Sequence, residues 1–548
     1  MKIIHTKLLA AVLALALPLT LAGCGAAAQQ TESGAAAPAA QTAAVSTAAL
    51  ASSVPAAAEA VSDPEQADAQ AQGEFSVTAS DGGAVTRSGS VWTVTAAGEY
   101  TLTGALADGQ VVVDAGDEDV VVLILDNAAI ACSTGAPILI LNADDVTVKA
   151  AEGSYNTVAD LRSGDAENEE YDAAIWSDCD LKLRGKGTLI VTSSYAKGVK
   201  SKDDLSVKNL TLKVDSADTA LRGKDSVTVE SGTLLLLSAQ GDGINSDADI
   251  LISDEALSIS VGDDGIHADG ALTIAGGTVR VEDSHEGLEA NVVNIDGGST
   301  YVYGRDDGVN ARSGDATPLI SITGGYLEVA TPSGDTDAID SNGSIAMSGG
   351  FVLVRSGAGM GGMAGSVDAD GSVSVTGGTI IALGGVCAVP GSGSVNTWLS
   401  GNTALGAGDY TLTDADGGEI ASFTLSGSYS GVWIASDAIE LGGTYTLSRD
   451  GSAVASWTQS SQTEGSAPFG GMGSFGGFGG MGGGFGAPPS GEGGGQQGGF
   501  GGQQGGGQFP GRGGMRPGMP TDGQQPPELP TVGQQPPQMP TLDTTQSA

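Results

Sequence analysis

Hydrophobic and polar residues alternate with a period of two through the middle of the chain, and the alternation restarts at regular intervals. Apolar pairs precede a double glycine at Leu272/Ile274, Val293/Ile295, Ile320/Ile322, Ile345/Met347 and Val373/Val375. Further apolar pairs follow the double glycine at Val279/Val281, Leu327/Val329 and Val352/Val354. Strict alternation is typical of strands that are buried on one face. The pattern therefore predicts short strands separated by glycine-rich turns.

A second landmark, an acid-Gly-aliphatic turn, recurs in phase with the double glycines. Its aliphatic residue stands at Ile175, Val199, Leu221, Ile244, Ile266, Leu288, Val309 and Ile339, in steps of 21 to 24 residues before a last step of 30. A unit of this length cannot close a core by itself, so neighbouring units must stack. We predict an all-β fold, a right-handed parallel β-helix with coils about 4.8 Å apart. A β-propeller is the alternative, but its blades need about 40 residues each.

The ends of the chain have a different composition from this repeat. Residues 24–73 are rich in Ala, Gln, Ser and Thr, and residues 461–548 are rich in Gly, Gln and Pro, so both segments are predicted to be disordered. Between them, we assign 74–394 to the β-helix and 395–460 to a small terminal β unit made of hairpins. The looser alternation near residue 100 is interpreted as the first coils and their cap.

The first 23 residues are predicted to be an export signal. A charged start at Met1-Lys2 precedes an apolar run from Leu8 to Leu21 and the small-residue sequence Leu21-Ala22-Gly23-Cys24. The stretch resembles a bacterial lipoprotein signal, which implies cleavage before Cys24 and lipid attachment to its thiol. The predicted location is then the bacterial cell surface, anchored in the membrane. The alternative is an ordinary signal with a chance cysteine.

Charge and cysteine content narrow the classes of partner. The chain has 22 Lys and Arg against 65 Asp and Glu, a net charge of −43. Nucleic acid is excluded as a partner because binding phosphate requires basic residues; cations are favoured instead. Beyond Cys24, the cysteines Cys132, Cys179 and Cys387 lack metal-ligand spacing. We expect them to be small buried residues, with a free thiol as the alternative.

Stacking places the acidic turns of successive coils in columns. The residues two before the aliphatic marker form one column, Asp242, Asp264, Glu286, Asp307 and Asp337, and the residues one after it form another, Asn245, His267, Glu289, Asn310 and Asp340. Carboxylates about 4.8 Å apart repel by roughly 3–4 kcal/mol at an effective dielectric constant near 20, so a column favours a bound cation. Oxygen ligands suit calcium, and zinc is disfavoured because only His267 and His285 lie nearby. The alternative is turn chemistry, in which Asp bonds the local backbone and Gly adopts positive φ. The candidate ligands are Asp242, Asp263, Asp264, Glu286, Glu289, Asp306, Asp307, Asn310, Asp337 and Asp340.

The same alternation predicts which side chains point outward after each double glycine. Aromatic rings on adjacent coils would form a flat surface for sugar rings, and arginines beside them could bind carboxylates. The alternative is that the rings pack under the tail or an inserted loop. The candidate carbohydrate-binding residues are Tyr301, Tyr303, Tyr326, Phe351, Arg280 and Arg355.

Several phrases of the chain resemble one known family in the same order. They are "STGAPILILNADDVTVKAAEGSYNT", "DAAIWSDCDLKLRGKGTLIVTS", "GVKSKDDLSV", "LRGKDSVTVESGTL" and "DAIDSNGSIAMSGGFVLV". The family is that of bacterial carbohydrate-binding β-helix domains, whose fold is similar to pectate lyases. Over about residues 75–460 the resemblance implies a β-helix that binds calcium and acidic or cellulosic polysaccharide.

Binding is favoured over catalysis by the placement of basic residues. A calcium-dependent lyase needs Lys or Arg as a base beside the metal, but the lysines cluster early, at Lys197, Lys200, Lys202 and Lys224. We therefore expect a monomeric, lipid-anchored surface protein that binds polysaccharide with calcium shaping the site. The alternatives are a structural or adhesin β-helix without sugar binding, or a calcium-dependent polysaccharide lyase.

Overall fold

The computed structural model describes residues 45–46, 73–80, 83–163, 170–334, 336–357, 365–385 and 388–466. These residues form β-strands and turns, and no helix among them is long and apolar enough to cross a membrane. The predicted signal segment with Cys24, most of the predicted tether, the predicted tail beyond residue 466 and Cys387 lie outside the described residues. Residues 463–466 of the predicted tail form a strand. Of the described cysteines, Cys132 is buried and Cys179 half-buried, and both are free thiols.

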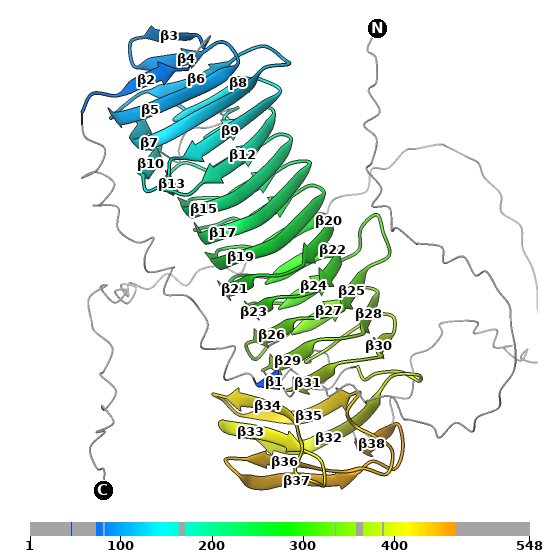
Figure 1. The fold of residues 1–548 in the computed structure, drawn as a ribbon. Helices are drawn as coiled ribbons and strands as arrows, with labels where there is room; N and C mark the ends of the chain where they lie inside the picture. Colours follow the sequence, from blue (N-terminus) through cyan, green and yellow to red (C-terminus); the bar gives the residue numbers. More distant parts are fainter. Residues whose placement is uncertain are drawn as a thin grey trace, which may run out of the picture. The chain divides into compact units, whose positions relative to one another are not determined.

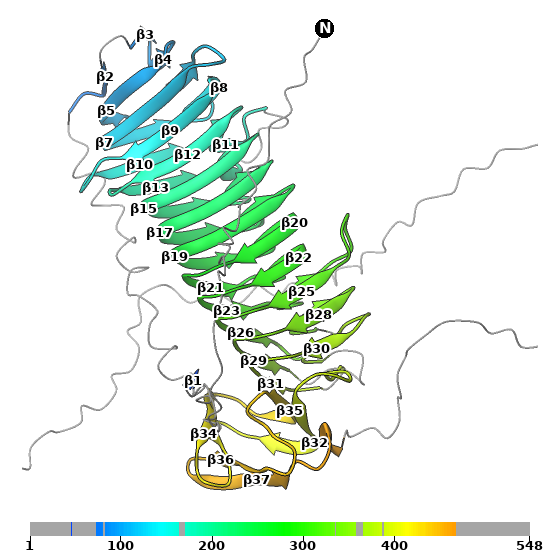
Figure 2. The ribbon, with the colours of Figure 1, turned by 45° about the vertical axis from the view of Figure 1, so that its right-hand side comes forward.

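The strands stack into a parallel β-helix, which confirms the predicted fold (Figures 1 and 2). Three parallel ladders run along it. The first, which we call the marker ladder, carries the aliphatic residue of each acidic turn. Its strands are β6 (Gln110–Asp114), β8 (Ile138–Asn142), β11 (Ala173–Ser177), β14 (Lys197–Ser201), β16 (Leu221–Gly223), β18 (Ile244–Ser246), the starts of β20 (Ile266–Ile274) and β22 (Leu288–Ile295), β24 (Val309–Ala311) and β27 (Ile339–Ser341).

The other two ladders follow in chain order within each coil. The second contains the first halves of β5 (Gly98–Leu106), β7 (Val120–Cys132), β15 (Asp204–Ser216), β17 (Ser226–Ser238) and β19 (Asp249–Val261), with β9 (Asp145–Ala150), β12 (Asp180–Gly185), the ends of β20 and β22, β25 (Leu319–Ile322), β28 (Ser344–Met347) and β30 (Val373–Val375). The third contains the second halves of β5, β7, β15, β17 and β19, with β10 (Tyr155–Asp160), β13 (Thr188–Ser193), β21 (Thr278–Asp283), β23 (Ser299–Tyr303), β26 (Tyr326–Thr331), β29 (Phe351–Ser356) and β31 (Thr379–Leu383).

The core of the solenoid is a stack of aliphatic side chains from all three ladders. Ile244, Ile266, Leu288 and Val309, in register on the marker ladder, are fully buried. Burial of each such side chain stabilises the fold by about 1.5–3 kcal/mol. Because every coil covers the apolar face of the next, the stack supplies the core that one coil lacks.

The two kinds of repeated glycine have different physical reasons. In the double glycines the second residue has positive φ, as at Gly277 (φ 78°), where the chain bends between ladders. The glycine of the acidic turn is not left-handed, contrary to the turn-chemistry interpretation. A Cβ at Gly287 would lie 2.0 Å from Val302 Cγ1 and 2.3 Å from the Gly308 carbonyl oxygen of the next coil. Close stacking of the backbones therefore selects this glycine.

Both ends of the solenoid carry antiparallel strands. At the start, β2 (Ser76–Ala79) pairs with β5, and β3 (Val85–Ser88) forms a hairpin with β4 (Val91–Val94). At the end, β35 (Tyr429–Ser436) pairs antiparallel with β31 and joins the terminal unit to the last coil. The other strands of the terminal unit are β1 (Val45–Ser46), β32 (Asn396–Leu405), β33 (Gly408–Thr413), β34 (Glu419–Leu425), β36 (Thr444–Arg449), β37 (Ser452–Thr458) and β38 (Thr463–Ser466).

Candidate functional site

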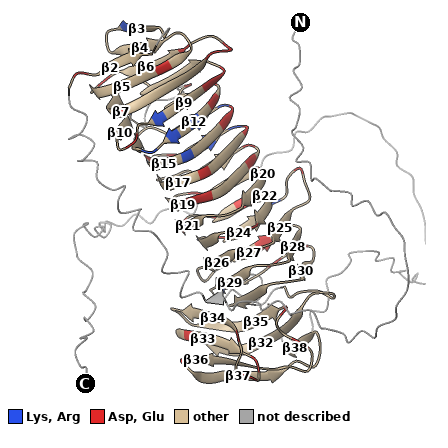
Figure 3. Cartoon of the chain, in the orientation of Figure 1, with Lys and Arg blue, Asp and Glu red and all other residues tan. Residues whose placement is uncertain are grey.

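One outward-facing position of the marker ladder carries charged and aromatic side chains on successive coils. We call these side chains the outer column. Strand register aligns Trp176, Lys200, Arg222, Asn245, His267, Glu289, Asn310 and Asp340, in this order. The column predicted from Asn245 to Asp340 therefore exists, and it continues upstream into basic and aromatic residues. In Figure 3, Lys and Arg segments lie around β12 and β15, while Asp and Glu recur along the turns.

The second predicted column, which we call the turn column, is also present. Its members are Asp242, Asp264, Glu286, Asp307 and Asp337. The Asp242 carbonyl oxygen accepts a hydrogen bond from the Ala220 amide, and the other four carbonyl oxygens accept from the acidic-turn glycines of the preceding coils. Their carboxylates bond along the stack as well. The Asp264 amide donates to Asp242 Oδ1 at 3.2 Å, and the Asp337 amide donates to Asp307 Oδ1 at 2.9 Å. Backbone amides thus satisfy part of each carboxylate and leave further lone pairs free to bind a cation.

Cationic side chains lie in the upper part of these columns, on the coils that carry Asp242, Asp264, His267 and Glu289. His267 Nδ1 lies 3.1 Å from Asp264 Oδ2, and this hydrogen bond raises the pKa of His267. Burial and the neighbouring Glu286 carboxyl group raise the pKa of Glu289, whose Oε1 atom lies 2.7 Å from the Arg312 Nε atom. Burial, followed by the charge of Asp264, raises the pKa of Asp242 to about 6. The protein itself therefore supplies positive charge at these coils.

The lower part of the columns receives no such charge. We call Glu286, Asp307, Asn310 and Asp340 the acidic set; its three carboxylates form no ion pair with Lys or Arg among the described residues. Burial raises the pKa of Asp307 to about 7, and the charges of Asp340 and Glu286 add to the rise. Burial likewise raises the pKa of Asp340 to about 6. Within the described ranges, Asp307 and Asp340 therefore have no Lys, Arg or His partner.

An unsatisfied oxygen lies in the acidic set. Asn310 Nδ2 donates to Glu286 Oε2 at 3.0 Å, whereas Asn310 Oδ1 is buried with no hydrogen-bond partner within the described ranges. A buried carbonyl oxygen without a donor usually requires an explanation. Carboxylate and amide oxygens are the donor set that calcium prefers, so the acidic set has the chemistry of a calcium site, while the closest ligand groups of these coils include a histidine.

The remaining predicted ligands surround these columns. Asp263 is exposed and Asp306 half-exposed, on the flank of the turn. Among the described residues, three groups of predicted ligands have possible ligand atoms that all lie within 4.8 Å of one another: Asp242/Asp264/His267, Asp263/Asp264/His285 and His285/Glu286/Asp306. Each of these three groups includes a histidine, whereas a fourth group, Asp180/Asp203/Asp204, contains only carboxylates and was not predicted. The structure therefore places five of the ten predicted ligands in such close groups.

The predicted aromatic surface is wrong for two of its four rings. Tyr326 is 7% exposed and Phe351 is 3% exposed, and the two rings stack with centroids 5.8 Å apart. The terminal unit covers them, because β35 pairs with β31 and places an apolar cluster on this face. The cover is the terminal unit rather than the tail or an inserted loop that the alternative named.

The other predicted sugar contacts are largely engaged within the protein. Tyr301 and Tyr303 are half-buried. The Arg280 guanidinium lies 4.5 Å from the Tyr301 ring centroid and covers that ring, while Arg280 Nε donates to Glu282 Oε1 at 2.5 Å. Arg355 pairs with Glu328. A free platform of four rings is therefore absent from the described face.

Sequence reasoning missed a pocket at the upstream end of the outer column. It has a volume of ≈250 Å³ and is lined by Glu170, Trp176, Lys200, Lys202, Arg222 and Lys224. The signal was available, because Trp176, Lys200 and Arg222 each follow a marker residue, as Asn245 does. The prediction from the sequence covers only the coils with acidic turns.

Comparison with known proteins agrees with the resemblance seen in the sequence. Residues 88–336 match the family model described as "Carbohydrate-binding domain-containing protein". A protein of Acetivibrio thermocellus with the same description is 34% identical over 125 residues, which are 22% of this chain and 44% of that protein. The chain thus spans less than half of the length of this curated relative.

A solved structure is similar over a longer stretch. It is the polysaccharide lyase-like protein from C. thermocellum, as a gadolinium derivative, with 25% sequence identity over 54% of this chain and 90% of that chain. The TM-score is 0.29. The family match lies within the solenoid and includes the basic pocket and most of both columns. Residues 88–336 of this chain are thus similar to the family described as carbohydrate-binding domain-containing proteins.

Proposed function

We propose that this protein binds polysaccharide on its β-helix and that calcium occupies the acidic set. The family of residues 88–336 supports carbohydrate binding in general. The observation that carries the calcium part is the contrast within one pair of columns: His267 and Arg312 compensate the upper carboxylates, and the described residues offer no equivalent cation to Asp307 or Asp340.

Calcium would stabilise the acidic set in its ionised form. Two carboxylates on adjacent coils repel by roughly 3–4 kcal/mol at an effective dielectric constant near 20, and a divalent ion reverses this term. Glu286, Asp307 and Asp340 would supply carboxylate oxygens, and Asn310 Oδ1 would supply the neutral oxygen that is otherwise unsatisfied. Calcium bound there would also offer coordination positions to a carboxylate on a polymer.

The polymer class that this arrangement favours is an acidic, pectin-like polysaccharide, with a cellulosic polymer as the second candidate. Without a cation, a chain of net charge −43 repels a polyuronate. A surface-bound calcium ion removes that repulsion locally and bridges carboxylates of both partners. Neutral cellulose would not depend on calcium in this way, so calcium dependence separates the two polymers.

Calorimetric titration of the chelator-treated full chain tests this proposal. Calcium is titrated first, and polygalacturonate or a soluble cellulose derivative is then titrated with and without calcium. Asp307→Asn/Asp340→Asn should abolish calcium binding, and the matched control Glu99→Gln/Asp416→Asn, which removes two exposed carboxylates elsewhere, should bind calcium normally. Calcium binding that is equal in both double variants would refute the assignment of the acidic set, and absence of binding to either polymer would refute the carbohydrate function. Unsaturated products released from polygalacturonate would indicate a lyase.

We also propose that Cys24 anchors the protein in a membrane as a lipoprotein. The charged start, the apolar run from Leu8 to Leu21 and the Leu-Ala-Gly-Cys sequence support this proposal. In cells that express the full chain, Cys24→Ser should move the protein from the membrane fraction to the soluble fraction. Unchanged membrane association of this variant would refute lipid anchoring.

A further inference from the structure

The basic pocket on the upper coils differs in charge from the rest of the chain. Four of its six lining residues are Lys or Arg, and one is acidic, in a protein with three times as many acidic as basic residues. A volume of ≈250 Å³ accommodates a group of the size of one sugar ring or smaller. The pocket therefore selects for a small anionic group.

The stacking of coils fixes the pocket walls. Trp176, Lys200 and Arg222 are consecutive members of the outer column on β11, β14 and β16. Lys202 and Lys224 form a second column beside them, because the Lys202 amide donates to the Ser177 carbonyl and the Lys224 amide donates to the Ser201 carbonyl. The cationic groups thus originate on strands spaced about 4.8 Å apart, which is a rigid arrangement of side-chain origins.

One residue of the pocket, Trp176, has a buried donor without an acceptor. Trp176 is 3% exposed, and its indole Nε1 has no hydrogen-bond partner within the part of the chain that the structure describes. The Tyr171 ring contacts the indole edge to face at 4.8 Å, and Lys202 Nζ lies 5.6 Å from the indole centroid. A buried indole N–H normally finds an acceptor. An oxygen atom of a ligand would satisfy it.

All four basic side chains of the pocket are already paired, but they keep donors for a ligand. Lys200 Nζ lies 2.7 Å from Asp172 Oδ1, and Lys202 Nζ lies 2.5 Å from Asp178 Oδ1. Arg222 pairs with Asp247 and donates to Asn245, and Lys224 Nζ lies 3.4 Å from Asp225 Oδ1. Each ammonium group has three donors and each guanidinium five, so these pairs leave N–H groups available. The acidic partners lie outside the set of residues that line the pocket, where they hold the cationic side chains in place.

We propose that this pocket binds the carboxylate of a uronic acid residue, with Lys200, Lys202 and Arg222 as charge-assisted donors and Trp176 Nε1 as a neutral donor. This inference rests on the proposed carbohydrate function and names a substrate class and a subsite for it. Lys and Arg bind carboxylates through short, strong hydrogen bonds, and a sugar hydroxyl is a suitable acceptor for the indole N–H. The subsite requires no calcium, since its positive charge comes from the protein.

Titration of the full chain with trigalacturonate in the presence of a chelator tests the subsite. Lys200→Gln/Lys202→Gln should weaken binding by at least about tenfold, because two charge-assisted hydrogen bonds are lost. Trp176→Phe retains the aromatic contact and removes the N–H, and it should weaken binding by about three- to tenfold. The methyl ester of trigalacturonate should bind the native protein as weakly as the free acid binds the double lysine variant.

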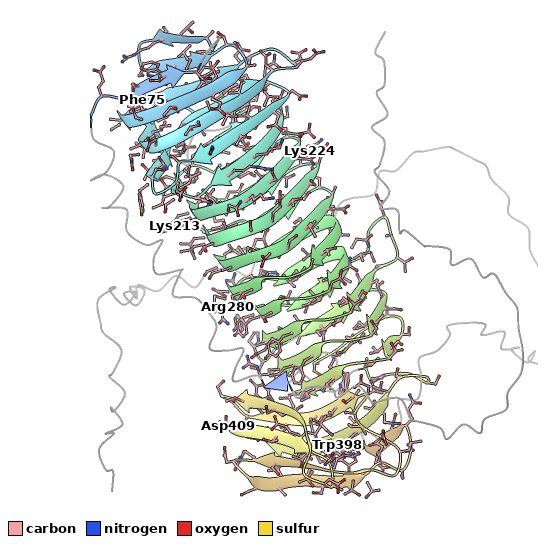
Figure 4. The ribbon with its side chains drawn as sticks, viewed as in Figure 1. Phe75, Lys213, Lys224, Arg280, Trp398 and Asp409 are labelled. Atoms are coloured by element: carbon pink, nitrogen blue, oxygen red, sulfur yellow. The ribbon has the colours of Figure 1, made fainter. Side chains whose placement is uncertain are left out.

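Lys213→Gln is the matched control. Lys213 lies on the third ladder, in register with Ile190, and Figure 4 shows it on the opposite side of the solenoid from Lys224. This variant should bind trigalacturonate as the native protein does, and all variants should bind calcium normally and melt at the native temperature. Equal affinity of the lysine, tryptophan and control variants would overturn the subsite.

The outcomes separate this inference from the proposed function. Binding of trigalacturonate that needs calcium and disappears in Asp307→Asn/Asp340→Asn, but not in the double lysine variant, would overturn the subsite and support the proposed function. Binding of cellulose without binding of trigalacturonate would likewise overturn the subsite and support the proposed carbohydrate function. Binding of acetate or phosphate with the affinity of trigalacturonate would identify a general anion pocket and would also overturn the assignment to a sugar.

Discussion

Replacement of Glu255 by glutamine should remove a pH-dependent loss of stability. Glu255 is 5% exposed and occupies an inward position of the third ladder, in register with Gly232 and, one coil further, with Leu210. Its two carboxyl oxygens make no hydrogen bond of normal geometry among the described residues. Burial raises the pKa of Glu255 to about 8, an effect that the nearby backbone amides of Ser253 and Asp254 do not offset.

The sign of the effect follows from the raised pKa. A carboxyl group that binds its proton more tightly in the folded state favours folding when it is protonated in both states, below about pH 4.5. As the pH rises, the unfolded chain ionises first, and the contribution is lost progressively until the folded pKa near 8 is passed. A shift from 4.5 to about 8 corresponds to a loss of about 4 kcal/mol between pH 5 and pH 9, at 1.36 kcal/mol per pKa unit.

Urea unfolding of the native protein and of Glu255→Gln, followed by circular dichroism from pH 5 to pH 9 in a chelator, measures this difference. Glutamine has the shape of the protonated acid and does not titrate, so the variant should gain on the native protein as pH rises, by up to about 4 kcal/mol. Other buried carboxylates contribute equally to both curves. Glu99→Gln, at an exposed position, should follow the native curve. Parallel pH profiles of the native protein and Glu255→Gln would refute the reasoning.

Three further variants test separate parts of the structure. Gly287→Ala places a Cβ against the next coil and should destabilise the protein by about 1–3 kcal/mol in urea, whereas Gly391→Ala, whose nearest atom is 3.6 Å away, should be neutral; equal midpoints would contradict the close-stacking explanation. Arg162→Ala removes the partner of the fully buried Asp160 at 2.6 Å and should cost about 3–5 kcal/mol, and a second change of Asp160→Asn should recover part of this loss in the same assay. Asp307→Asn should stabilise the calcium-free protein increasingly from pH 5 to pH 8, because the pKa of Asp307 is raised to about 7, and should lose the stabilisation by calcium seen in the native protein; a flat difference between the melting curves would contradict this assignment.

The repeat made the fold predictable, and the same repeat predicted which side chains share a column. The order of Asn245, His267, Glu289, Asn310 and Asp340 follows from their constant offset from a buried aliphatic residue. In a solenoid the contacts across coils obey this offset, so sequence spacing converts directly into neighbourhood. Ion pairs do not obey it: Arg312 reaches back from the lower coils to Glu289, and only the coordinates show that it neutralises this carboxylate.

The error at Tyr326 and Phe351 has a different physical origin. Alternation correctly places both rings on the outer face of β26 and β29, but it does not reveal what covers that face. The terminal unit does so through long-range contacts, which include Trp398 and Tyr410 in one apolar cluster. Trp398 is labelled in Figure 4 within this unit. The alternation with a period of two does not indicate how segments outside the repeat pack against it.

The distribution of charge along the outer column has a consequence for how a polymer binds. From Arg222 at the edge of the basic pocket to Asn310 in the acidic set, the column takes four coil steps, about 19 Å at about 4.8 Å each. The Debye length at physiological ionic strength is about 8 Å, so charges at the two places are largely screened from each other. Calcium at the acidic set therefore leaves the affinity of the basic pocket for a short ligand unchanged.

A polymer long enough to reach both places behaves differently. Its second contact becomes intramolecular once the first has formed, so the affinities reinforce each other. We expect calcium to leave the binding of trigalacturonate unchanged and to tighten the binding of galacturonate oligomers once their length spans the four coils. Calorimetric titration of an oligomer series with and without calcium measures this, and Asp307→Asn/Asp340→Asn should make the long oligomers respond like the short one. A calcium effect that is equal at all lengths would show that the two places do not act as separate subsites along one bound chain.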